Sequence, residues 1–284
     1  MAITPGKPLQ IQFGGNTALI QCADPTLQQL LACHFRYCLN QTGPVVAVYR
    51  LTLPARQTAQ LERDDELLYR GASTSYLCQC LMQDLTMQLT AHCRRDLVFH
   101  AAGLARAEYG LILCGASGRG KSTLAAKLIA SGYDYLTDEL VAVSPERAEM
   151  RGLARSLALK EGSASVWQNS LTASTPPDLT HFSNGVSWLA PELLRPDCVR
   201  HSAQPRLLLF PDYTAGHPFT AQPLSTAKAV LYLMQALINA KNLPDQGFSL
   251  ATHLARQTKA YGLTYSDASR VSDWLEAIIR KDIS

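Results

Sequence analysis

The chain has 284 residues, of which 47% are hydrophobic and 17% are charged, and its formal net charge is +3. This length and composition suit one large folded domain or two small ones and exclude a disordered tail. A net charge so close to zero also disfavours a dedicated DNA-binding protein, in which basic residues gather in a patch or stripe.

The sequence offers no targeting or redox signal. No apolar stretch approaches the roughly 20 residues that a membrane helix needs, and residues 1–6 lack the charged start and apolar run of a signal peptide. No pair among the eight cysteines has Cys-x-x-Cys spacing. We therefore expect a cytoplasmic protein with reduced, mostly buried cysteines, and neither membrane nor nucleic acid among its partners.

The first 95 residues are predicted to form an N-terminal α+β module. Asp24 is placed as the N-cap of a helix with Pro25 at its first position, and the Gly14-Gly15-Asn16 sequence indicates a tight turn between two strands. The predicted strands are 9–13, 17–21, 45–53 and 66–69, and the predicted helices are 25–35 and 73–91. This segment carries no obvious chemistry, so it is predicted to be a scaffold or a substrate-docking module.

The character of the sequence changes near residue 96, where short apolar runs surround a glycine-rich loop. The predicted elements are strands 96–99, continued by 101–106, and 111–114, a helix over 123–130, and strands 135–136 and 140–143. They form a strand–loop–helix–strand unit.

The loop itself is a full match to the P-loop pattern, Gly115-x-x-x-x-Gly120-Lys121-Ser122. Its glycines let successive backbone N–H groups point into one concavity, and the helix that follows aims its positive end at the same place. Lys121 can reach the β and γ phosphates, and the Ser122 hydroxyl can bind Mg²⁺. The predicted nucleotide-binding residues are Gly115, Ser117, Gly118, Arg119, Gly120, Lys121, Ser122 and Thr123, although Arg119 could equally face solvent.

Two acidic residues, Asp138 and Glu139, follow the next strand. Because the carboxyl ends of neighbouring parallel strands face one crevice, we expect both carboxylates near the nucleotide. One could bind Mg²⁺, and the metal site is placed on Ser122 and Asp138. The other could accept the proton of an attacking hydroxyl. The alternative is a solvated turn in which Asp138 is a simple cap.

The rest of the chain is loop-rich up to residue 220 and helical beyond it. Short strands are predicted over 156–159, 185–189, 206–210 and 261–265, and helices over 226–241, 249–259 and 267–281. His100, in Phe99-His100-Ala101-Ala102, is on spacing alone most simply a core histidine.

Taken together, Phe99–Ala102, Leu113–Thr123 and Tyr135–Glu139 resemble the HPr kinase/phosphorylase superfamily, whose P-loop core is shared with phosphoenolpyruvate carboxykinases. The chain looks closest to the stand-alone HPr-kinase-related proteins, which include kinases that phosphorylate a serine of lasso-type peptides. Leu159–Ser163, Trp188–Pro191 and Leu209–Pro211 are similar to later landmarks of those proteins. The resemblance is specific over residues 99–143 and loose elsewhere.

The resemblance implies a catalytic set of His100, Lys121, Asp138 and Glu139, with ATP and Mg²⁺ as cofactors. It makes a phosphate or substrate contact by Lys160 an open alternative to a surface charge, and leaves Arg206 and His217 as weaker candidates. The superfamily carries two aspartates where this chain has Asp138-Glu139, and a glutamate where it has Thr123. We also find no glycine- and asparagine-rich signature near the C-terminus. These departures argue against the reverse phosphorylase reaction and against HPr as substrate.

The sequence therefore predicts an α/β fold, with an N-terminal α+β module at 1–95 and a P-loop kinase domain at 96–284. The expected function is an ATP-dependent kinase acting on a hydroxyl, favouring a serine of a peptide or small protein. A small-molecule kinase, acting on free serine or a sugar, and a nucleotide-binding regulatory module without transfer remain alternatives. The oligomeric state stays open, and a homo-oligomer is compatible with the sequence.

Overall fold

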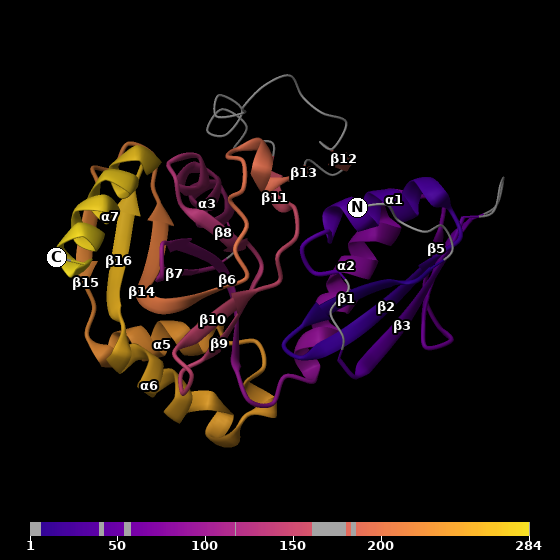
Figure 1. Cartoon of the computed structure of the whole chain (residues 1–284), viewed down its shortest axis with the longest axis horizontal. Coiled ribbons are helices and arrows are strands. Elements are labelled where there is room, and N and C mark those ends of the chain that lie inside the picture. Colours follow the sequence, from indigo (N-terminus) through magenta and orange to yellow (C-terminus); the bar gives the residue numbers. More distant parts are fainter. Residues whose placement is uncertain are drawn as a thin grey trace.

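The computed structural model describes residues 7–39, 43–53, 58–116, 118–160, 180–182 and 186–283. Ser117 and the end of the Leu159–Ser163 segment lie outside the described residues. Figure 1 shows two lobes side by side, each built around its own sheet. The fold is mixed α/β, as the sequence predicts.

The first lobe is a five-stranded sheet with two helices packed against it. The sheet order is β1-β2-β3-β4-β5. The Oδ1 atom of Asp24 accepts a hydrogen bond from Leu27 N at 2.7 Å, which confirms the predicted N-cap. Gly14 and Gly15 have φ angles of 58° and 82° and form the predicted turn. The elements are β1 (Leu9–Phe13), β2 (Asn16–Cys22), α1 (Pro25–His34), β3 (Val45–Thr52), β4 (Ala59–Arg63), β5 (Glu66–Gly71) and α2 (Thr74–Ala91).

The second lobe is an eight-stranded sheet covered by helices on both faces. The order is β10-β9-β6-β7-β14-β16-β15, with β8 also paired to β6. One apolar core joins this sheet to α3 and α7, and another joins its opposite face to α5 and α6. The elements are β6 (Leu97–Arg106), β7 (Tyr109–Cys114), α3 (Lys121–Ala130), β8 (Asp134–Thr137), β9 (Leu140–Ser144), β10 (Glu149–Gly152), β14 (Ser202–Tyr213), β15 (Thr220–Pro223), α5 (Thr226–Ala236), α6 (Phe248–Gln257), β16 (Lys259–Tyr265) and α7 (Ala268–Ile283).

A smaller sheet, β11-β13-β12, lies beside α3 and completes the described strands. Its members are β11 (Leu157–Lys160), β12 (Thr180–Phe182) and β13 (Val186–Leu189). The apolar core of the first lobe also takes in Val98, Leu153, Ala154 and Trp188, so part of the contact between the two lobes is apolar. The chain passes between them at residues 92–96. The expected boundary at residue 95 remains a prediction.

The arrangement around β6 differs from the sequence expectation. We expected the strand before the P-loop and the strand before Asp138 to be neighbours in a parallel sheet. Instead β6 lies between them and pairs antiparallel with both β7 and β8. Because β7 and β8 both run opposite to β6, their carboxyl ends still meet at one edge, where the first half of β6 also lies.

The predicted helix over 226–241 is too long, because α5 ends at Ala236. Beyond it the chain turns extended, and Ile238 N donates to Val98 O at 2.9 Å. Buried Asn239 then accepts from Val98 N at 2.9 Å and donates to the carbonyls of Cys93 and Asp96. These hydrogen bonds tie the end of α5 to the passage between the lobes, and they compete successfully with further helical turns.

All eight cysteines are free thiols, and six of them are buried, as predicted. No helix in the described part of the chain is both long and apolar enough to cross a membrane.

Candidate active site

The glycine-rich loop connects the end of β7 to the first turn of α3. Gly118 and Gly120 have φ angles of 84° and 85°, a left-handed conformation that favours glycine. A Cβ added to Gly120 would lie 2.8 Å from the Tyr265 hydroxyl. The helix begins at Lys121 rather than at Thr123, so Lys121, Ser122 and Thr123 occupy its first turn. The backbone thus takes the tight turn and helix start that the motif predicts.

Lys121 is buried, with 6% of its surface exposed, and its ammonium group stays inside the loop. Its Nζ donates to Gly115 O at 2.6 Å and to Ala116 O at 3.1 Å. Burial lowers the pKa of Lys121, while the charges of Glu139 and Asp138 act in the opposite direction. Lys121 is therefore held at the loop within electrostatic reach of both carboxylates.

Asp138 and Glu139 interrupt what would otherwise be one continuous strand along β6. β8 pairs with the second half of β6 and β9 pairs with the first half, where His100 lies opposite Leu140. Ala101 N donates to Glu139 O at 3.1 Å, and Ala101 pairs with Cys114 on the other side. This register places the acidic pair one strand away from the P-loop.

Asp138 is 2% exposed and firmly held. Its Oδ2 accepts from Ala158 N at 3.0 Å, and its Oδ1 lies 3.1 Å from the hydroxyl of buried Tyr135. Burial raises the pKa of Asp138, although the positive charge of Arg155 opposes that rise. A fixed carboxylate with a raised pKa is suited to accept a proton.

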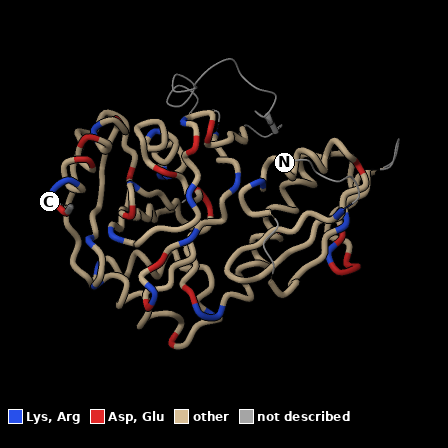
Figure 2. Tube along the Cα trace, viewed as in Figure 1, with Lys and Arg blue, Asp and Glu red and all other residues tan. Residues whose placement is uncertain are grey.

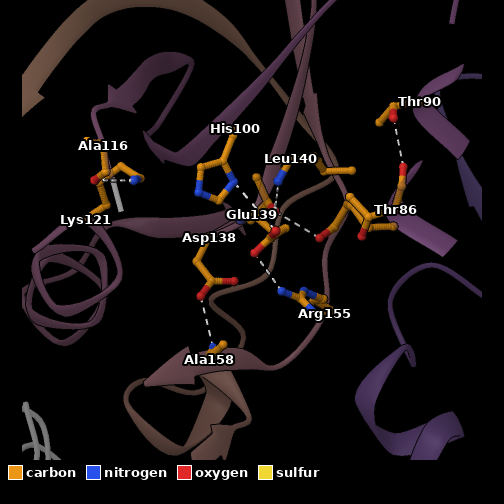
Figure 3. A network of polar contacts seen from close by, with 12 residues as sticks. Thr86, Thr90, His100, Ala116, Lys121, Asp138, Glu139, Leu140, Arg155 and Ala158 are labelled. Carbon is orange, nitrogen blue, oxygen red and sulfur yellow. Dashed lines mark hydrogen bonds and ion pairs between the residues drawn. The ribbon is translucent and has the colours of Figure 1, made fainter. Parts of the chain in front are cut away.

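Glu139 lies between a histidine and an arginine (Figure 3). Its Oε2 accepts from Arg155 Nη2 at 2.8 Å, and its Oε1 is 3.6 Å from Nδ1 of His100. The side chain of Arg155 is 8% exposed, whereas that of His100 is 40% exposed. Burial alone would lower the pKa of Arg155, but the charges of Glu139 and Asp138 outweigh it and raise that pKa. Arg155 therefore stays charged and orients Glu139 toward His100.

Sequence reasoning did not find Arg155. A signal was present, because Arg155 follows the apolar residues Leu153 and Ala154, which are both buried. An arginine in a buried run usually has an acidic partner. Its partner could not be named from the sequence, because the two residues are 16 positions apart and the turn between β9 and β10 lies between them.

The structure brings some of the other candidates close to this site and leaves others away from it. Arg119 forms an ion pair with Asp212 at the end of β14, so its guanidinium contacts a carboxylate of the protein itself. Lys160 ends β11 and is exposed, and its positive charge contributes to the lowered pKa of Lys121.

Arg206 donates to Gln204 near the start of β7, at the opposite end of that strand from the loop. His217 is hydrogen-bonded to Pro218 O and, among the described residues, makes no hydrogen bond or ion pair with the catalytic candidates.

The residues present fit a phosphate group and a magnesium ion. The two left-handed glycines and the first turn of α3 provide backbone N–H groups and a positive helix end for phosphate. Ser122 and the acidic pair supply hydroxyl and carboxylate oxygens, which are the ligands that Mg²⁺ prefers. No group of three or more His, Cys, Asp or Glu side chains forms a ready-made metal site among the described residues. The oxygens of Ser122 and the acidic pair would instead suit an ion that is held jointly with phosphates.

Comparisons with known proteins add little to this description. No family model matches the chain, and no curated protein matches it. The chain is similar to the solved structure of the Hpr(Ser) kinase/phosphatase from Coxiella burnetii, with 13% sequence identity and a TM-score of 0.31, over 65% of this chain and 95% of that one. A match at this TM-score does not carry function across to this chain.

Proposed function

We propose that this protein is an ATP-dependent, Mg²⁺-dependent kinase that phosphorylates a hydroxyl group, with a serine of a peptide or small protein as acceptor. The observation that carries the proposal is the placement of buried Lys121 at the start of α3, with Asp138 and Glu139 one strand away across Ala101 of β6. A protein that only binds nucleotide needs the lysine and one carboxylate for Mg²⁺, whereas this site has a second carboxylate, and the buried Asp138 with its raised pKa can serve as a base.

Each side chain then has a distinct role. Lys121 and the loop N–H groups hold the triphosphate, and Ser122 with a carboxylate of the acidic pair holds Mg²⁺, which neutralises phosphate charge. The acceptor oxygen forms a bond to the γ-phosphorus while the bond from that phosphorus to the bridging oxygen of ADP breaks. The proton of the hydroxyl passes to Asp138.

We assign the proton to Asp138 rather than to Glu139 because their surroundings differ. In the described part of the chain, Asp138 accepts its hydrogen bonds from uncharged groups, and burial raises its pKa. Glu139 is neutralised by the guanidinium of Arg155, which makes it a weaker base. Glu139 is then the carboxylate of the pair that would hold Mg²⁺. His100 is in position to orient the acceptor or the transferring group, and Lys160 is a further candidate to contact phosphate.

The test is transfer of ³²P from γ-labelled ATP in the presence of Mg²⁺, with one pool of serine-containing peptides and one of metabolites. Label on a peptide that disappears with Lys121→Met supports the proposal. Label confined to a metabolite keeps the kinase activity but replaces the acceptor. Tight ATP binding with no transfer to either pool contradicts the proposal and favours a regulatory nucleotide-binding module.

A further inference from the structure

A hollow away from the P-loop lies where the two lobes meet. It has a volume of about 810 Å³. Its walls come from the β1–β2 turn at Gly14 and Gly15, the passage at residues 92–96, and the β9–β10 hairpin. Neither Lys121, His100, Asp138 nor Glu139 lines it. We call it the junction cleft.

Arginines dominate the charge of the junction cleft. Arg94, Arg95, Arg147 and Arg151 line it, against the carboxylates of Asp96 and Glu149, which leaves two positive charges in excess. Arg94 and Arg95 are exposed, and no hydrogen bond or ion pair engages their side chains within the described part of the chain. In Figure 2, Lys and Arg positions lie next to Asp and Glu positions where the chain passes between the lobes.

The cleft already shows which chemistry its arginines bind. Arg147 Nη2 donates to both carboxylate oxygens of Asp96 at 3.2 Å, and Arg151 Nη2 donates to Glu149 at 2.7 Å. Guanidinium groups recognise carboxylates through such paired, charge-assisted hydrogen bonds. Arg94 and Arg95, on the wall formed by the passage, offer the same donors, so further carboxylates are the complementary ligand.

One segment connects the cleft to the catalytic residues. Gly152 and Ala154 line the cleft, and the next residue, Arg155, donates to Glu139, which does not line it. A small acceptor bound in the cleft would not touch the P-loop residues. A peptide can do both, because an extended chain advances about 3.3 Å per residue and can place a serine beyond its anchored part.

From these observations we infer that the junction cleft binds an acidic segment of the peptide acceptor, anchored mainly by Arg94 and Arg95. The identity of the occupant as the acceptor rests on the proposed function. The binding of an acidic peptide does not, so the two can fail separately.

The test measures binding of fluorescein-labelled hexaglutamate to the full-length protein by fluorescence anisotropy, with hexalysine as the opposite-charge probe. The double variant Arg94→Glu/Arg95→Glu is compared with Arg70→Glu/Arg270→Glu, which reverses two exposed arginines elsewhere and changes the net charge equally. The first variant should raise the Kd for hexaglutamate about tenfold or more, because it places like charges in the cleft. The control should change it less than about twofold, and hexalysine should not bind.

Lys121→Ala separates this site from the P-loop, because it should leave hexaglutamate binding unchanged. Equal losses of hexaglutamate binding in the two double variants would show general charge attraction and overturn the inference. Loss of binding with Lys121→Ala would also overturn it, as would displacement of the probe by tripolyphosphate but not by unlabelled hexaglutamate. If hexaglutamate binds as expected while no kinase activity is found, acidic-peptide binding by the junction cleft is supported and the proposed function fails.

Discussion

The Nη2 atom of Arg155 lies 2.8 Å from Oε2 of Glu139, although the two residues are 16 positions apart in the chain. Only 8% of the Arg155 side chain and 27% of the Glu139 side chain are exposed. Water therefore does little to solvate this guanidinium, and the carboxylate is its main compensation. The pair fixes the direction of Glu139, whose other oxygen faces His100.

We predict that Arg155→Gln lowers kcat about 10- to 100-fold, the usual effect of removing a group that orients a functional side chain. The KM for ATP should change little, because Arg155 does not belong to the P-loop. The free energy of unfolding should fall by about 1–3 kcal/mol, since Glu139 loses its charged partner but stays partly hydrated. Steady-state kinetics and urea unfolding measure both effects.

Arg155→Lys and Arg50→Gln complete that experiment. Arg155→Lys keeps the charge without the planar fork, so it should restore part of kcat. Arg50 makes its ion pairs on the surface of β3 with 48% of its side chain exposed, so Arg50→Gln should cost about 0–1 kcal/mol and leave kcat unchanged. A normal kcat in Arg155→Gln would show that the pair is only structural.

Separate substitutions in the acidic pair test the assignment of the base. We predict that Asp138→Asn lowers kcat about 10²- to 10⁴-fold, the range for loss of a general base. Glu139→Gln should have a smaller effect, because Arg155 can still hold the amide oxygen. Nucleotide affinity, measured by calorimetry, serves as the control for folding of the loop. The reverse order of the two effects on kcat would transfer the role of base to Glu139.

Asp138 should also affect stability in a pH-dependent way. Its pKa is raised in the folded protein, so its charged form is disfavoured there, and its contribution to stability is lost as the pH rises through that raised pKa. Asparagine can keep both hydrogen bonds, since its oxygen can accept from Ala158 N while its amide donates to Tyr135. Asp138→Asn should therefore match wild type in acid and gain stability relative to it as the pH rises toward neutral. Urea unfolding at a series of pH values measures this difference, and a widening loss would contradict it.

The sequence predicts those parts of the site that are local in the chain. The P-loop, its flanking strand and helix, and the acidic pair follow from short motifs and hydrophobic periodicity. The position of β6 between β7 and β8 does not, because pairing between strands depends on contacts distant in sequence. The end of α5 is likewise set by Asn239, which bonds Val98 from 141 positions away. Strands β4, β10, β12 and β15 have at most five residues and, unlike the equally short β9 and β11, no run of apolar residues that would mark them.

Two lysines on α3 offer a matched test of phosphate binding. Lys121 donates to the loop carbonyls in the first turn, whereas Lys127 lies in the last turn. We predict that Lys121→Met lowers kcat on the order of 10²- to 10³-fold and weakens ATP binding, because the buried cation near the phosphates is lost. Lys127→Met removes the same charge from the same helix and should leave both unchanged. Equal ATP affinity in the two variants, measured by calorimetry, would contradict the phosphate-binding role of the loop.

The two left-handed glycines of the loop separate backbone strain from steric clash. A Cβ at Gly118 meets nothing within 4 Å, whereas a Cβ at Gly120 would lie 2.8 Å from the Tyr265 hydroxyl and 3.2 Å from Tyr213 Cβ. Gly118→Ala should therefore cost only the strain of a positive φ, about 1 kcal/mol in unfolding free energy. Gly120→Ala should cost more than this and weaken ATP binding further, because the side chain also pushes the start of α3 away from β16.

In Gly120→Ala, the added substitution Tyr265→Phe should recover part of the loss by removing the nearest atom. Thermal unfolding and ATP titration of the four proteins measure these effects, and an equal cost for the two glycine variants would show that the contact with Tyr265 does not constrain the loop.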